Sequence, residues 1–206
     1  CTFGSGAGSD GTFPAQLERL LAERPGAAAR VLNAGVPGYG SYQGRKWLET
    51  EGFALDPDVV VITLGYNDAS PATAGPWRPM QDGAVLSDRE YAAELRGFGR
   101  TGITRLLGRF LARRAPRDAP NPLVGVKTRS SLEDYRANLR AMVAGCRRRG
   151  ATPVIVVWPI LVQAQHDAEQ RTTTMLAEVY QAAAREVAAA EGAKLVDLVP
   201  LVAGRP

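Results

Sequence analysis

Short apolar runs alternate along the chain with segments of helical periodicity, and this alternation predicts an α/β fold. Three runs rich in valine, isoleucine and leucine predict strands at residues 58–64 (DVVVITL), 152–157 (TPVIVV) and 193–198 (AKLVDL). The first of these is a continuous apolar run, which is typical of a parallel strand that is buried on both faces. A shorter strand is predicted at residues 30–33 (RVLN).

The segments between these runs carry helix signals. Thr12 followed by Pro14 marks a helix start, and the spacing of the next leucines predicts a buried stripe made of Leu17, Leu20 and Leu21. A second helix is predicted from about residue 41 to 51. A third begins at Ser130, which opens an S-x-x-E capping box with Glu133, and ends near Gly150. Its apolar stripe includes Cys146, which we therefore expect in the core.

The order of elements favours a parallel sheet with helices on both faces. A fourth helix, with apolar residues at helical spacing from Leu176 to Ala190, lies between the last two strands. The length of 206 residues predicts one domain over residues 1–206. Within it, proline-rich irregular sequence marks an insertion at about residues 70–129. We expect this insertion to form a lid or a substrate wall, because open α/β sheets bind ligands at the carboxyl ends of their strands.

Composition excludes several classes of function. No apolar run approaches the roughly 18 residues of a membrane-spanning helix. Two cysteines and one histidine match no zinc-site spacing, so we expect neither a metal nor another cofactor. The net charge is +4, yet residues 96–149 alone hold 14 Lys and Arg against 3 Asp and Glu. Few aromatic residues interrupt this basic segment, so we interpret it as a solvated surface and expect no nucleic acid partner.

Three isolated motifs each suggest a binding or catalytic site but lack the neighbouring strand or acidic residue that such a site needs. The stretch Gly6–Gly11 matches G-x-G-x-x-G, but no strand precedes it, and the strand 30–33 ends at Asn33 instead of an acidic residue. Ser9 sits in a loose variant of the nucleophile elbow, which also needs an upstream strand. His166 follows the strand 152–157 but has no orienting carboxylate in the expected place.

Two glycine-rich loops that follow predicted strands are stronger candidates. Residues 33–40 (NAGVPGYG) follow the strand 30–33, and residues 65–68 (GYND) follow the strand 58–64. A backbone N–H beside an asparagine amide is a recurrent way to build an oxyanion hole, which stabilises a tetrahedral intermediate. Ordinary turn formation explains glycine and asparagine in these loops equally well.

Taken together, these blocks resemble the SGNH (GDSL-type) hydrolase family. The opening residues 1–4 (CTFG) resemble the end of the family's first motif, Gly-Asp-Ser-x-Thr-x-Gly, while NAGVPG and GYND resemble its second and third blocks. The resemblance implies a flavodoxin-like three-layer α/β/α fold with a parallel sheet, and a serine hydrolase acting on carboxylic esters. It also implies that the Gly38 N–H and the Asn67 side-chain amide hold the oxyanion.

The resemblance leaves two parts of the family pattern without a match. The nucleophilic serine would precede Cys1. No Asp-x-x-His block is found, since His166 has Gln163 three positions earlier and lies one strand too early, while Asp197 lies on the last strand with no partner. We therefore expect the first strand and the closing helix to lie outside residues 1–206, and we expect these residues alone to lack esterase activity.

The expected substrate is a small-molecule, lipid or carbohydrate ester. Two alternatives remain open on the sequence. The same site can serve an O-acyltransferase or deacetylase acting on a carbohydrate, and the fold can serve a non-catalytic flavodoxin-like binding module.

Overall fold

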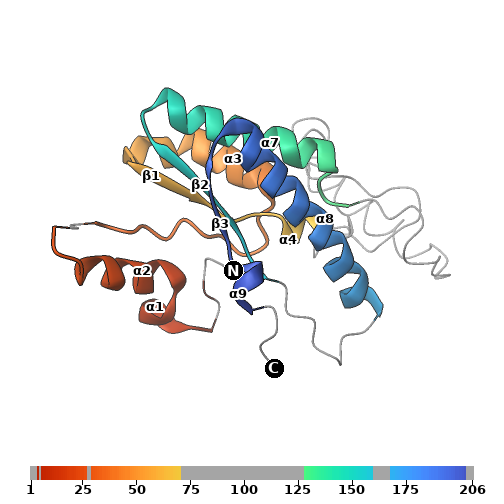
Figure 1. The fold of residues 1–206 in the computed structure, drawn as a ribbon, viewed down its shortest axis with the longest axis horizontal. Coiled ribbons are helices and arrows are strands. Elements are labelled where there is room, and N and C mark those ends of the chain that lie inside the picture. Colours follow the sequence, from red (N-terminus) through yellow and green to blue (C-terminus); the bar gives the residue numbers. More distant parts are fainter. Residues whose placement is uncertain (1–3, 5, 27–28, 71–127, 160–167, 203–206) are drawn as a thin grey trace, which may run out of the picture. The chain divides into compact units, whose positions relative to one another are not determined.

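A computed structural model describes residues 4, 6–26, 29–70, 128–159 and 168–202 (Figure 1). The chain forms two compact units, Cys1–Tyr39 and Gly40–Pro206. The prediction that residues 1–206 make one domain stays a prediction.

The first unit holds a single helical turn, α1 (Gly8–Gly11), and the helix α2 (Phe13–Ala22). The predicted start of α2 is confirmed, because the Thr12 hydroxyl accepts a hydrogen bond from the Ala15 N–H at 3.4 Å. The predicted burial of its leucine stripe is wrong, since Leu20 is 60% exposed. Helical spacing aligns apolar side chains on one face, but a unit this short has too little chain to enclose them.

The predicted strand at residues 30–33 is absent, and this segment runs as extended chain without strand pairing. A strand exists only where its backbone N–H and C=O groups pair with those of a neighbouring strand. Here the N–H of Val31 donates instead to the Glu18 carboxylate at 2.7 Å. The apolar character of the segment is therefore insufficient to define a strand.

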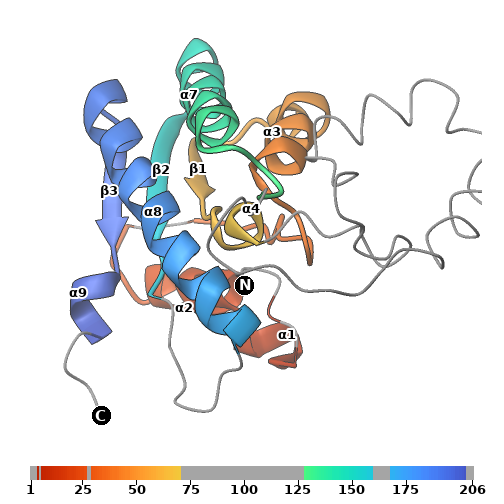
Figure 2. The same ribbon diagram turned by 90° about the vertical axis from the view of Figure 1, so that its right-hand side faces the viewer.

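The second unit contains a parallel sheet of three strands, β1 (Val59–Ile62), β2 (Thr152–Val157) and β3 (Lys194–Asp197). They lie side by side in the order β1-β2-β3 (Figure 2), with Val61 opposite Val154 and Val156 opposite Val196. The three predicted strands of this unit are thus confirmed, as is the parallel α/β class.

Two helices connect these strands and pack on one face of the sheet. They are α7 (Leu132–Arg148) and α8 (Ala168–Glu191), with α3 (Ser41–Thr50) packed beside α7. Strands that are added in one direction through right-handed crossovers place their connecting helices on the same side. The core between sheet and helices includes Ile62, Ile155, Val157, Leu139, Val143, Cys146, Ala183 and Val187. Cys146 is fully buried there, as predicted.

The opposite face of the sheet corrects the prediction that β1 is buried on both sides. Val59 and Val61 point away from the core and are 52% and 40% exposed. In the described part of this unit, the helices that chiefly contact the strands are α7 and α8, and they pack on the core face of the sheet, away from Val59 and Val61. An apolar run shows that a strand tolerates burial, whereas the topology decides which faces are covered.

The predicted start of one helix is wrong by one residue, and a helix that was not predicted follows the last strand. The helix α7 is capped by Ser131, whose hydroxyl accepts a hydrogen bond from the Asp134 N–H at 3.0 Å, and not by Ser130 with Glu133. Two Ser-x-x-acid patterns overlap here, Ser130–Glu133 and Ser131–Asp134, and the second one forms the cap. The sequence pattern predicts no helix after the last strand, but the one-turn helix α9 (Val199–Val202) follows β3.

Most of the predicted insertion, residues 71–127, lies outside the described residues, so its role as a lid or substrate wall stays a prediction. Its two ends are described and are held together by backbone hydrogen bonds. The Arg129 N–H donates to the Ser70 carbonyl at 3.0 Å, and the Ser130 N–H donates to the Asp68 carbonyl at 3.3 Å. We call these four residues the neck. The inserted segment therefore leaves and rejoins the fold at one point, after β1 and the short helical turn that follows it.

Candidate active site

The loop after β1 carries Asn67 and depends on a glycine at its turn. Gly65 has a φ of 128° and precedes the one-turn helix α4 (Tyr66–Ala69), in which Asn67 is the second residue and is half-buried. A Cβ atom at Gly65 would lie 3.1 Å from the hydroxyl of Tyr135 on α7. That hydroxyl donates to the Leu64 carbonyl at 3.0 Å. Backbone conformation and close packing thus both require glycine here.

Asp68, the residue after Asn67, takes part in a buried hydrogen-bond network. The Asp68 side chain accepts two hydrogen bonds on Oδ1, from the Ser41 N–H at 2.8 Å and from the Ser41 hydroxyl at 2.5 Å. The Asn138 amide in turn donates to the Ser41 hydroxyl oxygen at 3.0 Å. Ser41 and Asp68 are fully buried and Asn138 is 5% exposed. We call Ser41, Asp68 and Asn138 the buried clamp, because it joins the starts of α3 and α4 to α7.

An aromatic pair supports the same loop. Tyr135 and Tyr180 meet edge to face with ring centroids 5.1 Å apart, and the Tyr180 hydroxyl donates to the carbonyl of Ser130 in the neck. Burial, and then the negative charge of Asp68, raise the pKa of Tyr135 above its usual range. Tyr135 therefore stays protonated and remains a hydrogen-bond donor to the Leu64 carbonyl.

The second block, in the first unit, consists of two consecutive turns. The Asn33 side chain accepts a hydrogen bond from the Gly35 N–H at 3.0 Å, and the Tyr39 N–H donates to the Val36 carbonyl at 3.2 Å. Pro37 and Gly38, with a φ of 78° at Gly38, give this second turn the sequence signature of type II. Because Gly38 and Asn67 belong to different units, their pairing in an oxyanion hole stays a prediction.

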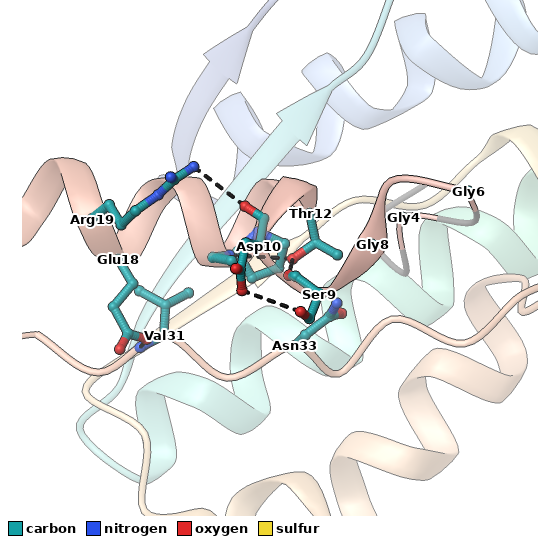
Figure 3. Close-up of a pocket in the computed structure, with 12 residues that line it drawn as sticks. Gly4, Gly6, Gly8, Ser9, Asp10, Thr12, Glu18, Arg19, Val31 and Asn33 are labelled. Carbon is teal, nitrogen blue, oxygen red and sulfur yellow. Dashed lines mark hydrogen bonds between the residues drawn. The ribbon is translucent and has the colours of Figure 1, made fainter.

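Part of the glycine motif Gly6–Gly11 lines an open hollow of about 720 Å³ in the first unit, through Gly6, Gly8, Ser9 and Asp10 (Figure 3). Gly6 and Gly8 take positive φ values, and Ser9 lies within α1, where its hydroxyl donates to the Asp10 carboxylate at 3.1 Å. The carboxylates of Asp10 and Glu18 line the hollow. Arg19 also lines the hollow, so its charged residues are two acids and one base, and this net negative charge disfavours the phosphates of a dinucleotide. A serine within a helical turn is not at a nucleophile elbow. These glycines form turns.

Two candidates remain, His166 and Asp197. His166 lies outside the described residues. Asp197 accepts two hydrogen bonds from the Arg185 guanidinium, at 2.7 and 3.2 Å, which ties β3 to α8. Within the described ranges, no three His, Cys, Asp or Glu side chains gather as metal ligands. The helices described there include none with the length and apolarity to cross a membrane.

Sequence reasoning did not identify the buried clamp. Its members are separated by 27 and 97 positions, so no local pattern links them. One signal was present. Asn138 lies three residues after Tyr135 and next to Leu139, on the apolar stripe of α7. A polar residue on a buried stripe requires a buried partner, although the sequence does not say which.

A model of the GDSL-like lipase/acylhydrolase family matches residues 1–206. The chain belongs to this family. The match covers both proposed oxyanion blocks and confirms the resemblance drawn from the sequence. No curated protein matches the chain.

Solved structures with this fold include two hydrolytic enzymes. LAE5, an alpha/beta hydrolase enzyme from the metagenome of Lake Arreo, Spain, is 20% identical with a TM-score of 0.54, over 91% of this chain and 63% of that one. Axe2, an acetylxylan esterase from Geobacillus stearothermophilus, is 17% identical with a TM-score of 0.54, over 95% and 67%. The chain thus spans less than two thirds of the length of LAE5. At these identities, the likeness establishes the fold.

Proposed function

We propose that the complete gene product is a serine hydrolase that cleaves carboxylic esters. The observation that carries this proposal is the family match over residues 1–206. It is supported by the placement of the G-x-N-D block directly after β1, at the edge of the sheet where α/β proteins bind their ligands. Two structures of Axe2 described as catalytic mutants replace a serine or a histidine of that enzyme.

The proposed mechanism is acyl transfer through a serine that the family pattern places before Cys1. Its oxygen attacks the ester carbonyl while a histidine removes its proton, and the carbonyl oxygen becomes an oxyanion. Gly38 donates its backbone N–H and Asn67 its side-chain N–H to this oxygen. The alcohol then leaves with the proton, and water releases the acid in a second, similar step.

Replacement of Asn67 tests this assignment. The complete gene product should hydrolyse p-nitrophenyl acetate, and Asn67→Ala should lower kcat by about 10²–10³-fold, because one oxyanion donor is lost. Asn67→Asp should be at least as damaging, since it replaces the donor with a negative charge. Gln16→Glu makes the same amide-to-acid change at an exposed site on α2, where the amide donates to the Gly11 carbonyl at 2.7 Å, and should leave kcat unchanged. Absence of hydrolysis, or an unaltered kcat in Asn67→Ala, contradicts the proposal.

We infer that the substrate is an acyl ester of a small molecule or a carbohydrate. Axe2 is named as an acetylxylan esterase, so acetylated xylooligosaccharides belong in the substrate panel beside a long-chain lipid ester. Transfer of the acetyl group to an added sugar, in place of its release as acetate, identifies the acyltransferase alternative.

A further inference from the structure

The helix α4, which carries Asn67, is too short to hold its own conformation. It is a single turn, with hydrogen bonds from the Ala69 N–H to the Gly65 carbonyl at 2.9 Å and from the Ser70 N–H to the Tyr66 carbonyl at 3.2 Å. A first helical turn fixes several backbone angles for very few hydrogen bonds and is unstable in isolation. Contacts from other elements must therefore fix its position.

Asp68 supplies those contacts on two sides. Its carboxylate is held by Ser41 through two hydrogen bonds, and its backbone carbonyl accepts the N–H of Ser130 in the neck. Hydrogen bonds to a carboxylate are among the stronger ones in proteins, and full burial shields these from water.

The donor and the acceptor can be assigned for each side-chain hydrogen bond of the buried clamp. The Asn138 Nδ2 atom can only donate, so the Ser41 hydroxyl oxygen must accept from it. The hydroxyl hydrogen is then directed to Asp68 Oδ1. Each of these bonds thus runs in one direction, and all three side chains must keep their positions for the set of bonds to form.

We infer that Ser41, Asp68 and Asn138 are positioning residues for ester hydrolysis, which hold the Asn67 amide in the orientation that stabilises the oxyanion. This inference rests on the proposed function. Asn67 and Asp68 are adjacent on one turn, so a displacement of the Asp68 carboxylate rotates the backbone that carries the Asn67 amide. Donors of an oxyanion hole act by being oriented before charge develops.

A double-mutant cycle on kcat tests the inference. In the complete gene product, Ser41→Ala removes one bond to Asp68 and the acceptor of Asn138, while the Ser41 N–H bond remains. We expect kcat to fall by about 10–100-fold, since small misplacements of a reacting geometry have effects of this size. KM should stay nearly unchanged. In the Asn67→Ala background, Ser41→Ala should have no further effect on kcat, because the buried clamp acts through Asn67.

A matched control separates positioning from a general loss of stability. Ser131→Ala makes the same chemical change three residues before Asp134 and removes the cap of α7, outside the buried clamp. It should lower the melting temperature without lowering kcat. All variants are compared at a temperature at which circular dichroism shows them fully folded. If Ser41→Ala does not fold, Asp68→Asn, which keeps the shape and an acceptor oxygen, replaces it in the cycle.

The outcomes separate the two proposals. The positioning role is overturned, and the proposed function stands, if Asn67→Ala is impaired but Ser41→Ala keeps full kcat. The same holds if the losses of kcat in the two single variants multiply in the double variant. If Asn67→Ala itself keeps full kcat, both are overturned. A loss of kcat in Ser41→Ala that disappears in the Asn67→Ala background supports the positioning role.

Discussion

Replacing Gly65 with alanine tests why the loop after β1 has its shape. Gly65 has a φ of 128° and a ψ of −38°, a conformation that residues with a side chain avoid. The new Cβ atom would also lie 3.1 Å from the Tyr135 hydroxyl. The perturbation thus combines backbone strain with pressure on the hydroxyl that donates to the Leu64 carbonyl.

The two contributions have different sizes. Backbone strain of this kind costs about 1–3 kcal/mol. Displacement of the Tyr135 hydroxyl loses a buried hydrogen bond that contributes about 0.5–1.5 kcal/mol. Together they predict that Gly65→Ala lowers the free energy of unfolding by about 1.5–4.5 kcal/mol. Removing the hydroxyl by Tyr135→Phe relieves the close contact, so in that background Gly65→Ala should cost only the strain.

Urea unfolding followed by circular dichroism measures these differences in the two single variants and the double variant. Gly150→Ala is the matched control. Gly150 has a φ of 74°, but a Cβ atom added there would have no neighbouring atom within 4 Å, so this variant reports backbone strain alone. An unfolding free energy for Gly65→Ala within about 0.5 kcal/mol of the wild type, the range of neutral surface changes, would refute the reasoning. Strict additivity with Tyr135→Phe would refute the steric part.

Two further predictions concern titratable side chains. The Arg185 guanidinium, through its hydrogen bonds, holds the pKa of Asp197 below the ordinary value of 3.8, so the pair stabilises the fold above that pH and its contribution is lost as the pH falls through the lowered pKa. The stability difference between wild type and Asp197→Asn should therefore be largest near neutral pH and shrink in acid, which urea unfolding across pH measures; a constant difference contradicts it. Burial raises the pKa of the Cys146 thiol, so in a Cys1→Ser variant a thiol reagent should react only after unfolding, and rapid reaction of the folded protein would exclude a core position.

The sequence predicted those elements that local chemistry determines. β2 and α3 were placed to within a residue or two, and Thr12 was identified as the cap of α2, because the apolar run, the helical spacing and the capping hydroxyl all act within a few residues. The loop GYND was predicted to follow the strand 58–64, and Asn67 does lie on a turn after β1.

Features that depend on distant partners were missed. Residues 30–33 have the composition of a strand, but pairing decides whether one forms, and Val31 pairs with Glu18 instead. The exposure of Val59 depends on which face of the sheet the helices cover. The buried clamp is the extreme case, because Ser41 and Asn138 meet only once α3 and α7 pack together. No pattern within a few residues of either one encodes that meeting.

The neck has an evolutionary consequence. Because Ser70 and Arg129 are joined by a backbone hydrogen bond, the fold needs only that the chain between them leave and return at one point. The entropy of closing such a loop changes slowly with its length, by about 0.6 kcal/mol for each doubling. Segments of very different length and composition can therefore be exchanged at this junction while Asp68 and its partners stay in place. The junction therefore lets the inserted segment change during evolution without rebuilding the framework that holds Asp68.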